Sequence, residues 1–127
     1  GNSGVTDAFI IKVNELGEVE WDFSYGGNYN DLGNSIIYSD GGWVLVGKTY
    51  SYDVGMGDIM LIKVNDFGEL EWMKTIGGNM TDSALDIQLA LDGGFIISGI
   101  TYSENNMDGW IIKTDSRGNY KGMLEYP

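Results

Sequence analysis

The 127-residue chain contains neither cysteine nor histidine. The absence of cysteine excludes disulfide bonds, thiolate metal ligands and thiol nucleophiles. The absence of histidine excludes a Ser-His-Asp triad and any histidine-based zinc or iron site built from this chain alone. Chemistry that uses two carboxylates, as in glycoside hydrolysis, remains open.

Basic residues are also scarce, with 7 Lys and Arg against 19 Asp and Glu, which gives a net charge of -12. Such a chain would repel nucleic acid and anionic membrane surfaces, because both attract cationic proteins. The apolar runs are too short to cross a bilayer, and we recognise no signal peptide. We interpret residues 1–6 as a flexible lead-in or the remnant of a cleaved tag.

One sequence pattern occurs three times along the chain. The copies begin at Asp7, Asp58 and Asp108, spaced by 51 and 50 residues. We interpret 7–57 and 58–107 as complete copies and 108–127 as a partial third copy, within one domain. The recurrent positions are Asp7, Lys12, Gly17 and Trp21; Asp58, Lys63, Gly68 and Trp72; and Asp108, Lys113 and Gly118, with Gly122 in place of the third tryptophan.

Each complete copy predicts four short strands. In the first copy these are 7–14, 18–25, 34–39 and 43–51, where apolar and polar residues alternate with the period of two that strands require. Glycine in "NELG", "NDFG" and "DSRG" predicts turns, and "DGG" at 40–42 predicts a tight hairpin. We interpret 81–91 as a loop followed by a strand, since its counterpart in the first copy contains a glycine.

Four strands in about 50 residues, repeated in tandem, are typical of β-propeller blades. The pattern resembles the repeat of exported bacterial and archaeal propeller-like proteins, through "DGWIIKTDSRGN" at 108, "GEVEW" and "GELEW", "DGGW" and "DGGF", and the two G-x-T-Y-S strings. The resemblance implies blade architecture and an extracellular, cell-surface or periplasmic location. It implies no activity.

We therefore predict an all-β protein of propeller-type, four-stranded antiparallel blades in two and a half copies. Propellers usually close with four to eight blades, so three arrangements stay open. The chain is a fragment of a longer array, or it forms a homo-oligomer that completes a ring, or its ten strands form a two-sheet β-sandwich. An open blade edge would favour pairing with another chain.

The recurrent Asp and Lys residues are interpreted as structural, because a catalytic site is usually single. Two glutamate pairs, Glu18 with Glu20 and Glu69 with Glu71, lie two residues apart and hence on one strand face. Paired carboxylates are what a glycosidase uses, but these lie opposite an apolar stripe that contains tryptophan. They are therefore expected to form the solvated face.

The ends of the fourth strands supply candidates for a ligand surface, because aromatic side chains there neighbour Asp, Glu and Asn. The candidates are Tyr50, Tyr52, Asp53, Tyr102, Glu104 and Asn105. Such groups could stack on a sugar or hold a peptide. No cofactor is predicted; structural calcium in the loops 28–34, 51–58 and 103–108 is the alternative, although none matches a calcium-loop motif.

These observations favour a non-catalytic repeat module of an exported or cell-surface protein, used for scaffolding or for binding a protein or glycan. The alternative is a polysaccharide-active hydrolase that uses acidic loop carboxylates. A symmetric repetition of the acidic groups would favour the binding module, whereas two unpaired carboxylates in a cleft would favour the hydrolase.

Overall fold

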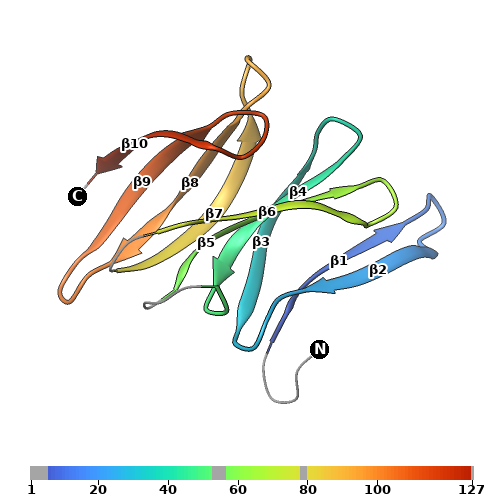
Figure 1. The fold of residues 1–127 in the computed structure, drawn as a ribbon, viewed down its shortest axis with the longest axis horizontal. Helices are drawn as coiled ribbons and strands as arrows, with labels where there is room; N and C mark the ends of the chain where they lie inside the picture. The colour runs from blue at the N-terminus through green and yellow to red at the C-terminus, as the bar shows by residue number, and fades with distance from the viewer. Residues whose placement is uncertain (1–5, 53–56, 78–79, 127) are drawn as a thin grey trace.

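Ten antiparallel strands form the whole regular structure of the computed structural model, which describes residues 6–52, 57–77 and 80–126 (Figure 1). Within these residues there is no helix, so the prediction of an all-β protein is confirmed. The prediction of a loop followed by a strand at 81–91 is wrong in its first part, because β7 begins at Thr81. The strands are β1 Ala8–Val13, β2 Val19–Tyr25, β3 Asp31–Tyr38, β4 Gly42–Thr49, β5 Asp58–Asn65, β6 Leu70–Ile76, β7 Thr81–Leu89, β8 Phe95–Tyr102, β9 Met107–Thr114 and β10 Tyr120–Tyr126.

The strands form three antiparallel sheets that lie side by side (Figure 1). β1 and β2 form a two-stranded sheet. The second sheet has the order β3-β4-β5-β6, and the third has the order β7-β8-β9-β10. Ten strands in three sheets differ from the two sheets of the sandwich alternative.

The sheets are out of phase with the sequence copies by two strands. β4 pairs with β5 along its whole length, from Gly42 opposite Asn65 to Thr49 opposite Asp58. Each four-stranded sheet therefore joins the second half of one copy to the first half of the next. The copy boundaries at 57/58 and 107/108 therefore fall within the four-stranded sheets. We call β3–β4 and β7–β8 the inner strand pairs: the first is bonded to β5 and the second to β9, whereas among the described residues no such pair is bonded to β1.

The glycine turns follow the predicted chemistry. Gly17, Gly68 and Gly118 have φ angles of 80°, 81° and 77°, in the region that residues with a Cβ rarely adopt. At the start of each turn an Asn or Asp side chain accepts two backbone N–H groups, as Asn14 does from Leu16 and Glu18. In the "DGG" hairpin Asp40 and Gly41 both have positive φ, 48° and 74°, as a two-residue turn between twisted strands requires.

Burial of β5 on both faces holds the sheets together. Its Ile59 and Leu61 face the third sheet, whereas Met60 and Ile62 face β1. The first cluster comprises Val44, Val46, Ile59, Leu61, Ala84, Ile87, Phe95, Ile97, Trp110 and Ile112. The second comprises Ala8, Ile10, Leu45, Met60, Ile62 and Val64, with the half-buried Trp21, Tyr25, Trp43 and Met73 packed against it.

The recurrent tryptophans occupy equivalent places. Trp21 lies over Gly68 in the turn of the next sheet, where an added Cβ would approach its Cε3 to 2.8 Å. Trp72 lies over Gly118 in the same way, with a corresponding approach of 2.6 Å to its Cη2. Among the described residues, nothing lies within 4 Å of the same point at Gly17. In both of the first two sheets a tryptophan therefore lies against a turn glycine of the next sheet, whereas no described residue packs on Gly17 in this way.

This difference predicts unequal effects of two matched substitutions. Gly17→Ala should cost only the strain of a positive φ, about 1 kcal/mol. Gly68→Ala carries the same strain and also crowds the rings of Trp21 and Phe23, which should add about 1 to 3 kcal/mol. Urea unfolding followed by far-UV circular dichroism measures both. Equal losses would show that the contact between tryptophan and turn contributes nothing to stability.

Candidate functional site

Each recurrent lysine forms an ion pair. Lys12 Nζ lies 3.1 Å from Glu20, and Lys63 Nζ lies 2.8 Å from Glu71. In the third copy a lysine, Lys121, replaces this glutamate, and Lys113 Nζ contacts Asp92 at 3.0 Å instead. The same role in three copies is that of a structural device.

The remaining glutamates of the two pairs stabilise the turns. Asn14 Nδ2 donates to Glu18 Oε2 at 2.8 Å, and Asn65 Nδ2 donates to Glu69 Oε1 at 3.3 Å. In each pair, therefore, one carboxylate accepts a hydrogen bond from the turn asparagine and the other forms an ion pair with a lysine. None of these four glutamates lines either hollow described below.

A buried carboxylate that recurs between copies joins neighbouring sheets. Asp31 is fully buried, and its carboxylate accepts hydrogen bonds from Thr49 Oγ1, from Ser51 Oγ at 2.6 Å and from the Gly27 N–H at 2.9 Å. Its own N–H donates to the carbonyl of Thr6, which precedes β1, at 2.6 Å. A residue of the second sheet therefore fixes the backbone immediately before β1, the first strand of the first sheet.

Asp82 repeats this arrangement one copy later. Its carboxylate accepts from Thr101 Oγ1, and its N–H donates to the Gly57 carbonyl, before β5, at 3.1 Å. We call the two sets the aspartate clips. The recurrence of this aspartate and of the G-x-T-Y-S string was visible in the sequence, but it gave no sign that the side chains meet.

The recurrent "GGN" string makes room for the aspartates. A Cβ at Gly26 would approach Asp7 Oδ1 to 2.5 Å and Asp31 Oδ2 to 2.7 Å. At Gly77 it would approach Asp58 Oδ1 to 1.7 Å. Asp7 and Asp58 thus pack against a glycine at equivalent points, and any larger residue there would displace the carboxylate.

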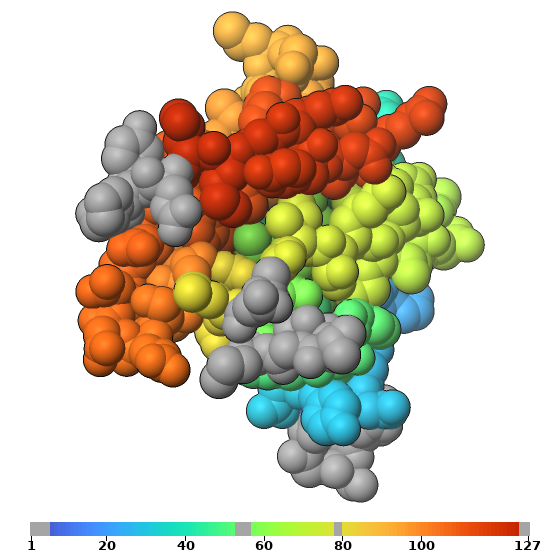
Figure 2. All heavy atoms as spheres, turned by 60° about the vertical axis from the view of Figure 1, so that its left-hand side comes forward, coloured from blue at the N-terminus to red at the C-terminus, as the bar shows by residue number. Residues whose placement is uncertain are grey.

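Three of the predicted ligand-surface residues come together in an open hollow of about 610 Å³ at one end of β7 and β8. These are Tyr102, Glu104 and Asn105. Figure 2 shows the connection between β8 and β9, in orange, projecting at the lower left of the molecule. The other lining residues are Met80, Thr81, Ser103 and Asn106.

The predicted residues of the first copy make internal contacts instead. Lys48 Nζ lies 4.7 Å from the ring centre of Tyr50, and Tyr52 Oη donates to the Gly26 carbonyl at 2.6 Å. Burial, followed by the nearby carboxylates of Asp31 and Asp7, raises the pKa of Tyr52. Asp53 lies outside the described residues. Neither Tyr50 nor Tyr52 lines the hollow at Tyr102.

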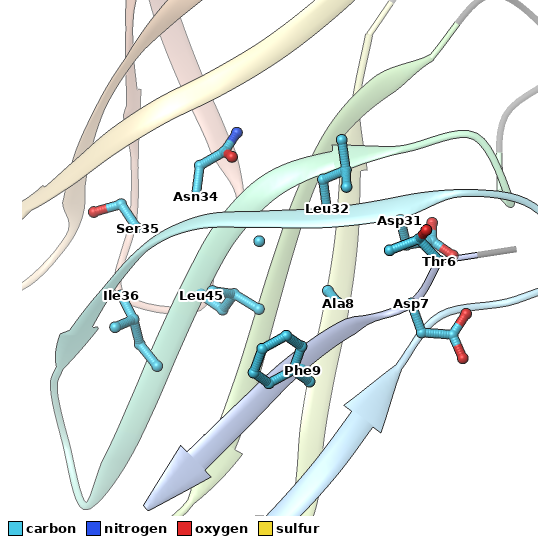
Figure 3. Close-up of a pocket in the computed structure, with 11 residues that line it drawn as sticks. Thr6, Asp7, Ala8, Phe9, Asp31, Leu32, Asn34, Ser35, Ile36 and Leu45 are labelled. Carbon is cyan, nitrogen blue, oxygen red and sulfur yellow. The ribbon is translucent and has the colours of Figure 1, made fainter.

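A second hollow, of about 300 Å³, lies between β1 and β3 (Figure 3). Phe9, Leu45 and Ile36 project into it from three strands. Asp7, Asp31 and Asn34 also line it, but the Asn34 amide bonds the Ala84 carbonyl and the Asp31 carboxylate bonds Thr49 and Ser51. We call it the β1–β3 cleft. No sequence motif indicated it, because it arises from strands of two different sheets.

The carboxylates whose pKa is shifted are engaged in turns and pairs. Backbone and side-chain hydrogen bonds from Asn119 lower the pKa of Asp115, and those from Gly94 and Lys113 lower the pKa of Asp92. The hydroxyl of Ser35, with Gln88, lowers the pKa of Asp86. In the described part of the chain, no three acidic side chains are grouped so that they could hold a metal ion.

No protein-family model and no curated protein sequence matches this chain. No helix within the described ranges is long and apolar enough to span a membrane. The resemblance to exported propeller-like repeats therefore remains a prediction from the motifs themselves.

The aspartate clip predicts a large stability loss for Asp31→Ala. The change removes the acceptor of the fully buried Thr49 hydroxyl, and an unmet buried donor costs about 1 to 3 kcal/mol. It also removes the hydrogen bonds from Ser51 Oγ and the Gly27 N–H. The exposed Asp22→Ala is the control and should stay within about 0.5 kcal/mol of wild type. Comparable losses of unfolding free energy for the two variants in chemical denaturation would contradict a stabilising role of the aspartate clip.

Asp115 predicts a specific pH effect. Its folded-state pKa is lowered, so its ionised form contributes stability that is present above the unfolded pKa and lost as the pH falls through the folded pKa. Asp115→Asn keeps the acceptor oxygen, as Asn14 and Asn65 do at the equivalent positions, but cannot titrate. The variant should lose less stability than wild type between about pH 5 and pH 2. Identical pH profiles of the thermal midpoint would refute this role.

Proposed function

We propose that the chain is a non-catalytic repeat module of an exported or cell-surface protein, built from propeller-type blades, which binds a glycan or a protein at the Tyr102 hollow. Its stacked sheets are the scaffold. Two features support the blade arrangement: the four-stranded antiparallel sheets, and the repeated contact of Trp21 and Trp72 with the next turn. The export rests on the resemblance of the repeat.

The single observation that carries the binding proposal is the convergence of Tyr102, Glu104 and Asn105 in one hollow. An exposed aromatic face can cover the apolar face of a sugar ring, while amide, hydroxyl and carboxylate groups bond its hydroxyls. The net charge of -12 and the carboxylate of Glu104 both disfavour anionic ligands. An uncharged glycan fits this chemistry best, and a protein loop is the alternative ligand.

The hydrolase alternative has less support. Glycoside hydrolysis normally requires two carboxylates that face each other across the substrate. Among the described residues that line the hollow, Glu104 is the one carboxylate. The glutamate pairs of the first two copies bond turns and lysines in both copies.

Substitution of Tyr102 tests the proposal, with Tyr50 as the matched control. Tyr50 holds the equivalent place in the first copy but contacts Lys48, where the second copy has Ile100. Tyr102→Ala should weaken binding of a neutral oligosaccharide at least about tenfold, because stacking on the ring is lost. Tyr50→Ala should leave it unchanged.

Cellohexaose and mannohexaose are suitable probes, with a hexagalacturonate as the anionic comparison, and amide chemical shifts report the site. The expected shifts are confined to 80–81 and 102–106. Binding that is insensitive to Tyr102→Ala, or tighter binding of the anionic probe, would overturn the glycan proposal. Release of reducing ends from a probe would favour the hydrolase.

A further inference from the structure

β1 differs from its two counterparts in having a neighbour on one edge only. β5 lies between β4 and β6, and β9 lies between β8 and β10, whereas β1 pairs with β2 alone in the sheets of the described residues. The free edge presents backbone N–H and C=O groups in the spacing that an added strand requires. The β1–β3 cleft lies beside this strand.

One isoleucine in β3 is far more exposed than its equivalent in β7. Ile36 and Ile87 are equivalent in the two four-stranded sheets. Ile87 is 1% exposed, because it lies in the cluster with Val44 and Val46 of the preceding sheet. Ile36 is 41% exposed, because the preceding sheet consists of β1 and β2 only and has no inner strands to cover it.

We infer that the free edge of β1 and the β1–β3 cleft accept an antiparallel strand pair of the β3–β4 type, supplied by a partner polypeptide. The partner strand carries aliphatic residues at alternate positions, which would cover Ile36 and Leu45 as Val44 and Val46 cover Ile87. Backbone pairing with β1 supplies affinity, and the cleft selects the side chains.

The register follows from the two pairings that the structure contains. Thr49 lies opposite Asp58, and Thr101 lies opposite Asp108, at the same end of the two strand pairs. Since Asp7 is the equivalent of both aspartates, the partner strand should place its own threonine opposite Asp7. Its residue three positions before that threonine should then lie opposite Ile10, as Val46 lies opposite Leu61.

A second copy of the chain is a less suitable donor. Its own β3–β4 pair is already bonded to β5, and its β7–β8 pair to β9. Donation would therefore require either sheet to open. A strand pair that is not already hydrogen-bonded to a third strand can pair with β1 without the opening of any sheet.

The test uses the wild-type chain and, as a probe, a synthetic peptide of residues 30–50, "NDLGNSIIYSDGGWVLVGKTY", which contains both inner strands. Addition of the peptide should slow amide exchange in β1 and shift the methyl resonances of Ile36 and Leu45. The same peptide with Val46→Pro is the control, since proline removes a ladder donor and should abolish the effect.

Two protein variants with matched exposure locate the binding. Ile36→Lys places a charge in the cleft and should weaken peptide binding at least about tenfold. Ile96→Lys alters a residue that is also 41% exposed but lies outside the cleft, and it should bind the peptide as wild type does. Equal binding by both variants, or protection that maps away from β1, would overturn the inference.

A fusion covers the case of a peptide that binds too weakly to detect. Residues 30–57 are placed before Asp7 in place of residues 1–6, so that the added strands reach β1 through the connection that β4 and β5 use. The fusion should unfold at a higher urea concentration than its Val46→Pro form. If neither the peptide nor the fusion affects β1, the inference fails. It also fails if sedimentation shows that wild-type chains alone pair through β1.

Discussion

The pairing of β4 with β5 is the contact on which the rest of the structure depends. It joins two sequence copies in one ladder, with eight residue pairs in unbroken register. The pairing places Val44 and Val46 beside Ile59 and Leu61 on one face, and Leu45 beside Met60 and Ile62 on the other. Because both faces are apolar, neither can remain in water, and each recruits a neighbouring sheet. The stacking is thus a consequence of how copies join.

The sequence predicted most of the strands because their signals are local, but it missed the starts of β3 at Asp31 and of β7 at Thr81. Alternation of side chains located β1 and β2, and glycine at Gly17, Gly68 and Gly118 located the turns with their positive φ angles. The grouping of strands into sheets is not local. The same two hairpins can be joined within a copy or across copies, and only the packing of β5 between two sheets decides which pairing forms. The phase of the sheets was therefore invisible in the sequence.

The candidate site was predicted in part for a related reason. Tyr102, Glu104 and Asn105 were identified as neighbours along the chain, and their hollow follows from the loop that contains them. Tyr50 and Tyr52 looked alike in sequence but contact Lys48 and Gly26. The difference comes from Ile100 and Glu104, which replace Lys48 and Tyr52 in the second copy. Tyr102 itself agrees with Tyr50 between the copies, so it is the change of the residues around it that leaves its ring available to a ligand.

The two outermost faces differ in a way that bears on partner choice. The open face of the third sheet carries Gln88 and Ser98, where the second sheet has Ile37 and Val46 in or against its core. Gly122 stands opposite Lys113, at the register position that Trp72 occupies opposite Lys63. The exchange is partial, because Ile96 and Ile111, the equivalents of Val44 and Leu61, stay apolar on this face and are each 41% exposed. The β1 side has no such substitutions: Phe9, Ile11 and Val13 stay apolar and exposed where Met60, Ile62 and Val64 are buried. Both ends of the stack therefore expose apolar side chains, but only the third sheet exchanges some of the equivalent positions for polar residues.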